Sequence, residues 1–338
     1  MNLNFYITIL VLCCCTNVSL WAQQPWCFTD QLHQQRYNSD AVYQQNFDEQ
    51  QQAIHQRVVD LLHHATNLRD LYTIPVVVHI VSPIGTPIGA GNNLTDAQVA
   101  TGLDMLNEAF ANTNNFQSAT GINTDIQFCL AQRTPDGQAT NGILRHYSDI
   151  VNQNDCNSPS FNYGDEQQLM DIAFWDCCQY VNIYLVTDIT GAGYGCSVAG
   201  YATVGSSCGF MVQESQYWNT FNGTQVTAHE MGHFFGLWHT FQNGCDVSAN
   251  DCLVDGDNVC DTPPDNETFS ACNANTCNTD SPDLPDDTNN YMDYGACTPW
   301  RFTAGQKTRM IATLETTQNC LLNSLACLSP CPAPLTAN

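Results

Sequence analysis

Residues 229–239 combine three histidines and one glutamate at a spacing that suits a metal ion. They read His-Glu-Met-Gly-His-Phe-Phe-Gly-Leu-Trp-His, which fits the pattern H-E-x-x-H-x-x-G-x-x-H. His229 and His233 are four residues apart, so on a helix both imidazoles project from one face, about one turn apart. Gly236 permits a backbone turn that brings His239 round as a third ligand. Three protein ligands leave one position open, as in a catalytic zinc site.

Glu230 lies beside the first histidine, where its carboxylate can reach a water on the metal. Zinc held by three imidazoles lowers the pKa of its bound water toward about 7 and polarises a carbonyl group. An ionised glutamate only accepts hydrogen bonds, so it can take the proton from that water and later give it to a leaving amine. The run therefore predicts metal-assisted hydrolysis with Glu230 as the general base.

A second motif follows about fifty residues later, at Asn289-Asn290-Tyr291-Met292-Asp293-Tyr294. It resembles the Met-turn that passes beneath the zinc in metzincins. Met292 would form a hydrophobic floor under the three imidazoles. Tyr294 would bring its phenol near the metal and donate to an oxyanion as charge develops there.

The charge balance excludes several classes of partner. The chain of 338 residues has 33 acidic residues against 8 Lys and Arg, a formal net charge of −25. Such a surface repels nucleic acid and anionic lipid, so we expect neither as a partner. It suits calcium binding or an extracellular setting.

The N-terminus and the cysteines both indicate export. Phe5 to Cys15 is an apolar stretch too short to span a bilayer, and Leu20-Trp21-Ala22 follows, so residues 1–22 resemble a signal peptide. A buried N-terminal strand is the alternative. No later segment is apolar enough to cross a membrane. Nineteen cysteines, less the three at 13–15, leave sixteen, a density typical of disulfides in a secreted protein.

Apolar periodicity places the expected elements around these motifs. Strands with a helix between them, followed by a helix that carries the site, indicate an α/β domain. The residues after His239 are loop-like and rich in Asp, Asn, Cys and Pro. We expect strands at 74–81, 126–130, 181–186, 200–204 and 209–212, and helices near 53–62, from Thr95 to Phe110, at 225–237 and from Thr303.

Four ordered motifs give the chain a resemblance to the pappalysin family of metzincins, including its ulilysin-like bacterial group. They are the zinc motif followed by Thr240-Phe241, then residues 256–263, then residues 290–294, then Phe302-Thr303-Ala304-Gly305-Gln306 with Arg309-Met310. The resemblance spans roughly residues 72–318. It implies a secreted zinc endopeptidase that acts on peptide or protein substrates and is synthesised as a zymogen.

The resemblance also implies a fold and a division of the chain. The fold would be the α/β (α+β) metzincin one, with a twisted, mostly parallel five-stranded sheet, an active-site helix and an irregular, disulfide-bonded lower subdomain. The edge strand, near 201–204, would pair with the substrate backbone. The divisions are a signal peptide (1–22), a prosegment (23–71), a catalytic domain (72–328, with upper part 72–239 and lower part 240–328) and a linker-like tail (329–338).

Two further sites follow from the same resemblance. Asp257, Asp261 and Thr262 match the family's calcium loop, and calcium takes oxygen ligands such as carboxylates; a solvated acidic loop is the alternative. Cys27, in Trp26-Cys27-Phe28-Thr29-Asp30, resembles the prosegment cysteine that occupies the open position on zinc in the zymogen. An ordinary disulfide is the alternative for Cys27, and cysteine parity favours it unless Cys327 and Cys331 pair outside this chain.

Substrate preference is less well defined than the chemistry. Family members that prefer arginine carry acidic residues just beyond the Met-turn tyrosine, whereas Gly295-Ala296-Cys297 follows Tyr294 here. A preference for basic substrates, and self-cleavage near Arg69, are therefore both in doubt. We interpret His63, His64, His79 and His146 as surface or core residues. Two other functions stay open: a catalytically silent binding or adhesion module, and a zinc hydrolase for a non-peptide bond.

Overall fold

The computed structural model describes residues 26–64, 71–191, 195–246, 248–249, 251–266, 271–278 and 282–330. The expected signal peptide, the expected cleavage site near Arg69 and most of the expected tail lie outside these residues. The helices are α1 (Thr29–Ser39), α2 (Ala41–His63), α3 (Asp96–Ala111), α4 (Glu166–Ile172), α5 (Phe221–Phe234) and α6 (Ala304–Glu315). The strands are β1 (Tyr72–Ser82), β2 (Ile126–Leu130), β3 (Ile143–Tyr147), β4 (Ser160–Asn162), β5 (Val181–Val186), β6 (Asp188–Thr190), β7 (Gly200–Ala202) and β8 (Phe210–Glu214).

A mostly parallel sheet with five positions across forms the frame of the molecule. Its order is β2-β1-β5-β8-β7, and β3 continues the outer position of β2 along the long strand β1. Strand β7 alone runs antiparallel, paired with β8 through Tyr201 and Val212. The predicted five-stranded, mostly parallel sheet is confirmed, and β7 is its edge at the predicted place.

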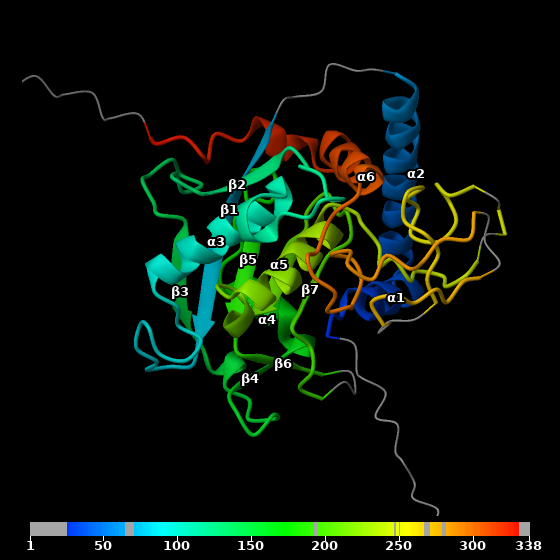
Figure 1. The fold of residues 1–338 in the computed structure, drawn as a ribbon. Coiled ribbons are helices and arrows are strands. Elements are labelled where there is room, and N and C mark those ends of the chain that lie inside the picture. Colours follow the sequence, from blue (N-terminus) through cyan, green and yellow to red (C-terminus); the bar gives the residue numbers. More distant parts are fainter. Residues whose placement is uncertain are drawn as a thin grey trace, which may run out of the picture.

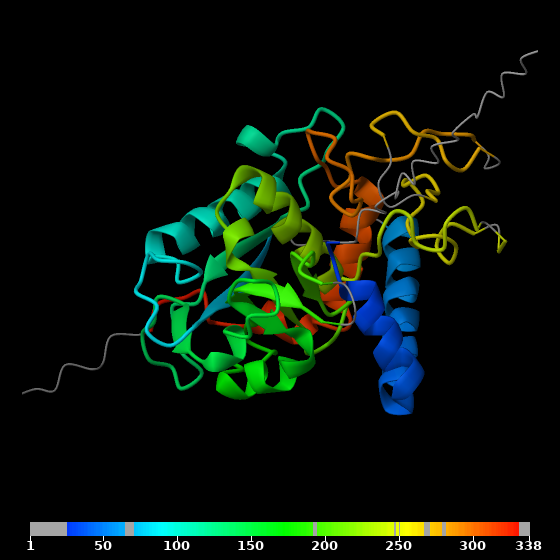
Figure 2. The same cartoon turned by 90° about the horizontal axis from the view of Figure 1, so that it is seen from below.

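Helices cover both faces of the sheet, which explains why β1 and β5 read as continuous apolar runs (Figures 1 and 2). Helices α3 and α5 pack on one face, and their apolar residues join those of α6 in the largest core cluster. On the other face α4 and the small β4–β6 pair meet a second cluster that contains Phe28 and Leu32 of α1 and its entry. The N-terminal residues are therefore part of the core.

Residues 26–64, which we call the N-terminal segment, run from the edge of the sheet to the lower half of the molecule. Helix α1 lies beside β7, and Asp40 then caps α2 by accepting from the backbone N–H of Val42 at 2.9 Å. Helix α2 packs along α6, as Figures 1 and 2 show, and buries Ile54 and Val58 there. The segment thus spans the two halves of the chain.

Disulfides link the loops between α5 and α6, where the described residues form no helix or strand. Three of them lie within residues 245–297, where the described chain forms loops. The others link residues 129–208 to one another or to the C-terminal residues. The pairs are Cys129–Cys327, Cys156–Cys196, Cys177–Cys208, Cys178–Cys320, Cys245–Cys277, Cys252–Cys260 and Cys272–Cys297. Among the described residues the free cysteine is Cys27.

The parity argument against Cys27 is thereby resolved. Cys327, for which pairing outside this chain was one possibility, is bonded to Cys129. Cys331 lies outside the described residues. The disulfide interpretation of Cys27 was therefore wrong.

Several element boundaries differ from the sequence prediction. Helix α2 (Ala41–His63) begins well before the expected 53–62, and two further differences lie near the site. The helix that carries the histidine motif spans Phe221–Phe234 instead of 225–237. It begins earlier because Thr220 caps its N-terminus, where Thr220 Oγ1 accepts a hydrogen bond from Gly223 N at 3.1 Å. It ends earlier because the chain turns at Gly236. The edge strand ends at Ala202 instead of Val204. Sequence patterns also missed the short elements β3, β4, β6 and α4, and the polar helix α1.

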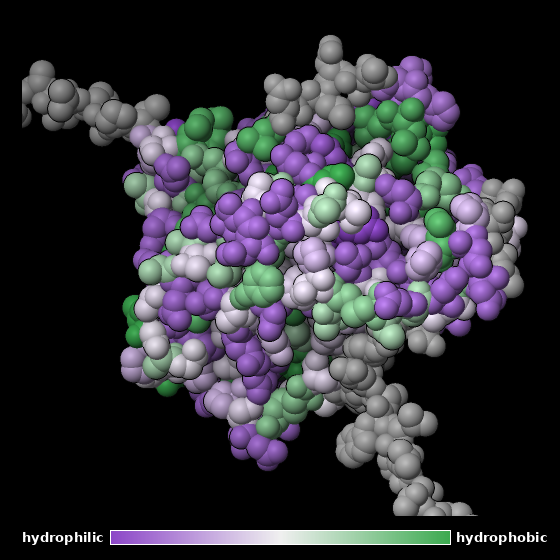
Figure 3. Space-filling view, in the orientation of Figure 1, coloured by the Kyte–Doolittle hydropathy of each residue, from purple (hydrophilic) through white to green (hydrophobic). Residues whose placement is uncertain are grey.

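The surface in view in Figure 3 is mixed in hydropathy. Figure 3 shows hydrophobic side chains scattered among hydrophilic ones on the face in view. Among the described helices, none is both long enough and apolar enough to cross a bilayer.

Glu214, at the end of β8, gives a prediction about stability and pH. It is buried, and its Oε1 accepts from Ile189 N at 2.9 Å; burial raises the pKa of its carboxyl to about 7. Because this carboxyl has a higher pKa in the folded than in the unfolded chain, it stabilises the folded protein at pH values below its unfolded pKa. That stability is lost as the pH rises through its folded pKa of about 7. Glu214→Gln should therefore reduce the fall in unfolding free energy between pH 5 and pH 8 by about 2–3 kcal/mol.

The measurement is denaturant unfolding of both proteins at the two pH values. Glu49→Gln, at an exposed position of α2, is the control and should leave the difference unchanged. An equal fall in the wild type and in Glu214→Gln would contradict the prediction.

Candidate metal centre

Three imidazoles converge at the C-terminal half of α5 as the motif predicts. The Nε2 atoms of His229, His233 and His239 lie 3.0–3.2 Å from one another, and all three side chains are buried. Ligands at about 2.05 Å from a tetrahedral zinc would be about 3.3 Å apart, so the triangle has the size of a zinc face.

The hydrogen bonds of the three Nδ1 atoms determine the tautomer of each ring, and so whether its Nε2 carries a proton. His229 Nδ1 faces the carbonyl oxygen of Tyr291 at 2.7 Å, and His233 Nδ1 faces that of Leu237 at 2.8 Å. His239 Nδ1 faces Asp30 Oδ2 at 2.7 Å. These oxygens only accept, so each Nδ1 carries the ring proton.

Three unprotonated Nε2 lone pairs therefore point into one buried space. Burial lowers the pKa of His233 to about 3 and that of His229 well below its ordinary value, so both rings stay neutral. Neutral imidazoles with lone pairs directed at one point repel each other unless a cation lies between them. The donor set thus fits a zinc ion.

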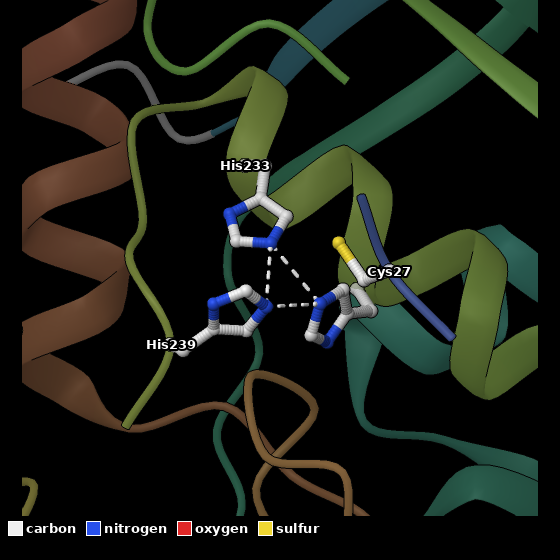
Figure 4. Close-up of side chains that lie close together, drawn as sticks. Cys27, His233 and His239 are labelled. Atoms are coloured by element: carbon white, nitrogen blue, oxygen red, sulfur yellow. Dashed lines mark hydrogen bonds between the residues drawn. The ribbon is translucent and has the colours of Figure 1, made fainter. Parts of the chain in front are cut away.

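Cys27 completes this group. Among the described residues, Cys27 and the three histidines form a group of side chains that could hold a metal, with ligand atoms all within 4.8 Å of one another. Figure 4 shows the sulfur of Cys27, on the N-terminal segment, directed toward the imidazoles of His233 and His239. A thiolate with three imidazoles is a closed four-ligand zinc set.

Glu230 lies next to the triangle but has no basic partner. Its Oε2 accepts from Thr29 Oγ1 at 3.2 Å and from Cys27 Sγ at 3.5 Å, while Oε1 has no hydrogen-bond partner in the described structure. Burial raises the pKa of this carboxyl to about 8. Gly200 of β7 makes room for it, because a Cβ there would lie 3.0 Å from Glu230 Cγ.

The Met-turn has two contacts with the centre. Its backbone supplies the Tyr291 carbonyl that holds His229, and Met292 packs beneath α5, where a Cβ on Gly232 would meet its sulfur at 2.4 Å. The buried Tyr294 hydroxyl donates to the carbonyl oxygen of Cys27 at 3.2 Å. Met292 and Tyr294 therefore lie where the sequence places them.

The N-terminal segment occupies the edge strand as well as the centre. Phe28 N donates to Gly200 O at 3.1 Å and Ala199 N donates to Trp26 O at 2.6 Å, in a parallel pairing beside β7. Thr29 Oγ1 accepts from Ala202 N at 3.0 Å. The backbone groups that would receive a substrate strand are thus already paired.

Sequence reasoning missed two groups of this segment. Thr29 contacts Glu230, and Asp30 contacts His239. Both stand within three residues of Cys27, but no sequence pattern tells which ring nitrogen an aspartate on another segment will reach.

The residues of the expected calcium loop take part in hydrogen bonds. Thr262 Oγ1 donates to both carboxylate oxygens of Asp257 at 2.8–2.9 Å. Asp261 accepts from Thr303 Oγ1 at 2.7 Å and from Gly305 N at 2.8 Å, at the start of α6. These bonds join the loop to α6, and calcium at this place stays a prediction.

The other histidines lie away from the centre. His79 is buried in β1, with Nε2 3.0 Å from Asn182 Oδ1 and Nδ1 3.3 Å from His146 Nε2. His63 and His64 are exposed at the end of α2. Their positions are those of a core pair and two surface residues.

Comparisons with known proteins agree with this geometry. The model of the peptidase M43 family, described as pregnancy-associated plasma protein-A, matches residues 163–315. An extracellular metalloprotease of Sordaria macrospora is 36% identical over 139 residues, which cover 38% of this chain and 46% of the relative. An extracellular metalloprotease of Colletotrichum graminicola is 28% identical over 247 residues, covering 70% of this chain and 74% of the relative. The chain thus spans less than half the length of the first of these relatives.

Two solved structures share the fold. A promirolysin mutant of Tannerella forsythia has a TM-score of 0.61 at 20% identity, covering 91% of this chain and all (100%) of that one. Mature mirolysin of the same organism, in complex with a cleaved peptide, has a TM-score of 0.58 at 22% identity and covers 78% and 100%. The relatives of Sordaria macrospora and Colletotrichum graminicola are both named extracellular metalloproteases, and disulfides such as Cys129–Cys327 are typical of extracellular proteins.

Gly236 gives a prediction about the third ligand. It has a φ of +84°, and a Cβ there would lie 2.5 Å from Thr313 Oγ1 on α6. Gly236→Ala should destabilise the protein by about 1–3 kcal/mol and lower its zinc content, because the turn to His239 must shift.

The matched control is Gly137→Ala, whose φ is +83° with nothing within 4 Å of the added Cβ. It isolates the backbone cost, and its zinc content should stay that of the wild type. Unfolding free energy and bound zinc per chain are measured for both. Equal losses in the two variants would contradict the role given to Gly236.

Proposed function

We propose that this chain, which belongs to the pappalysin (M43) family of metalloproteases, is a zinc-dependent endopeptidase made as a latent precursor. The observation that carries the proposal is the buried triangle of Nε2 atoms with every Nδ1 proton directed elsewhere. The three Nε2 atoms can bind a metal ion, and the neighbouring Glu230, with one unpaired carboxylate oxygen, can act as a base.

Each group at the centre then has a chemical task. Zinc, when held by His229, His233 and His239, would supply a Lewis acid for the scissile carbonyl and lower the pKa of water. Glu230 would take the proton of the attacking water and deliver it to the leaving amine. Its packing against Gly200 of β7 would hold the carboxylate beside a peptide bound along that edge.

Tyr294 would donate to the oxygen of the scissile carbonyl. Its hydroxyl already donates to a peptide carbonyl, that of Cys27, close to the metal ligands. Burial raises the pKa of this phenol well above its ordinary value, so it stays a donor. A developing oxyanion at the same place would receive a stronger hydrogen bond than a neutral carbonyl does.

The edge strand β7 would bind the substrate backbone. The backbone of Ala199 and Gly200 now pairs with residues 26–28 in a parallel bridge, which supports a role for this edge in binding an extended chain. Main-chain hydrogen bonds of this kind give affinity without specifying side chains. A peptide can bind there only after residues 26–28 have left.

The N-terminal segment would therefore act as a prosegment. Cys27 would take the fourth position on zinc, Thr29 covers Glu230, and α2 is held by the Arg57–Glu315 ion pair at 2.6 Å. The coverage of this chain falls from 91% with the promirolysin structure to 78% with the mature one, as expected if only the former carries a comparable segment.

The activity has a direct test. The activated protein and its Glu230→Ala variant are compared on a mixed peptide library, with and without a zinc chelator. Glu230→Ala should lower kcat/KM by at least about 10²–10⁴-fold, the usual contribution of a general base. Asp104→Ala, an exposed acid on α3, is the control and should cut like the wild type.

The cut-site pattern from the same library also defines the substrate preference. Cleavage by both the wild type and Glu230→Ala would overturn the mechanism. Cleavage by neither would favour a silent binding module on the same fold.

Cobalt binding tests the role of Cys27 by a spectroscopic signal, and a lag measurement adds a second readout. In the full chain with Glu230→Ala, Co²⁺ should give a sulfur-to-metal charge-transfer band, since thiolates are good ligands for such metals. Cys27→Ser should abolish the band, and in the chain with Glu230 intact it should shorten the lag before activity appears. A band that survives Cys27→Ser would contradict ligation by this cysteine.

A further inference from the structure

We infer that Asp30 is a positioning residue of the metal centre, so that the precursor holds its metal more tightly than the processed enzyme and is loaded with metal before the N-terminal segment leaves. The inference rests on the proposed function, because it concerns the same three histidines. It assigns to the N-terminal segment a supporting role in the metal site in addition to a blocking one.

The three histidines differ in where their Nδ1 acceptors come from. His229 and His233 are held by the carbonyl oxygens of Tyr291 and Leu237, both in the catalytic domain. His239 is held by Asp30 Oδ2 at 2.7 Å, from the N-terminal segment. Removing this segment leaves two acceptors in place and takes away the third.

His239 is also the ligand with the least support from its own element. It lies beyond the end of α5, after the turn at Gly236, whereas His229 and His233 belong to the helix. Its ring otherwise stacks on Phe241, with centroids 4.6 Å apart, and meets Tyr294 edge to face, with centroids 4.9 Å apart. These contacts limit the tilt of the ring, but they leave its tautomer to the hydrogen bond with Asp30.

A carboxylate on the far nitrogen of a metal-binding imidazole has two effects. It keeps the proton on Nδ1, and its charge makes Nε2 a stronger donor to the metal. Loss of such a partner typically weakens metal binding by about 10–100-fold. Asp30 is well placed for both effects because His239 is 1% exposed and Asp30 is itself 29% exposed at the rim.

One short stretch brings all these contacts together. Cys27 adds its sulfur to the metal group, Thr29 bonds Glu230 and Ala202, and Asp30 bonds His239. Withdrawal of this stretch opens the active site and removes both the thiolate and the carboxylate in one event. Metal affinity should therefore fall as activity appears, which places metal uptake before activation.

The test measures zinc affinity directly. Full chains carrying Glu230→Ala, so that they cannot process themselves, are titrated with Zn²⁺ against a competing fluorescent chelator. Asp30→Ala should weaken binding by about 10–100-fold. Asp30→Asn, which keeps an acceptor oxygen but loses the charge, should recover part of the loss.

Two controls separate positioning from general destabilisation. Asp40→Ala removes a carboxylate of the same segment that caps α2 and does not contact the centre, so zinc affinity should stay unchanged. Thermal unfolding in chelator should give similar midpoints for Asp30→Ala and Asp40→Ala. Cys27→Ser, alone and with Asp30→Ala, shows whether the two losses are additive.

The outcomes distinguish this inference from the proposed function. Asp30→Ala with the affinity of the parent chain, in a protein that binds zinc and whose processed form cuts peptides, would overturn the inference alone. So would a loss shared equally by Asp40→Ala. A parent chain that binds no zinc would overturn the proposed function itself.

Discussion

The main constraint on the structure is that three imidazole Nε2 atoms, each with an unshared electron pair, lie within 3.0–3.2 Å of one another in a buried space. Each ring is fixed from behind by an oxygen that can only accept, and these oxygens come from the Met-turn, the turn after α5 and the N-terminal segment. No single element supplies the site. The sheet, the lower loops and the N-terminal segment must all be in place before the three lone pairs meet.

This requirement explains the construction of the lower half. Residues 245–297 form loops in the described structure, yet they must hold the Tyr291 carbonyl within hydrogen-bond distance of His229. Three disulfides cross this region, one of them ending at Cys297 just after the Met-turn. Disulfides restrict the conformations of loops that contain little regular secondary structure, and they are typical of extracellular proteins.

The N-terminal segment is bound by many contacts of moderate strength. It adds a strand at β7, buries Phe28 in the second core cluster, packs α2 on α6 and forms ion pairs from Arg36 to Glu166 and from Arg57 to Glu315. Partly exposed ion pairs contribute little each, so apolar burial carries most of this docking.

Local patterns were sufficient for much of the fold and for the ligands. The apolar runs of β1 and β5, the capping Thr95 of α3 and the histidine spacing in α5 each depend on neighbours within a few residues, and all were predicted correctly. The ends of α5 were displaced because Thr220 and Gly236, a cap and a turn, decide them. Short elements such as β3 and α4 gain their stability from packing, which leaves little trace in sequence.

The sequence by itself thus determined the candidate residues for the chemistry: three histidines proposed to hold zinc, a glutamate proposed as the base, and Cys27 in a candidate prosegment. Only the tertiary structure decided how that chemistry is supported. It left Cys27 free by pairing the other described cysteines, brought the sulfur of Cys27 to the three histidines, and gave His239 a carboxylate from 209 residues away in the chain. The physical reason is that a ligand's identity follows from residue type and local spacing, whereas its tautomer and orientation follow from hydrogen bonds between segments far apart in sequence.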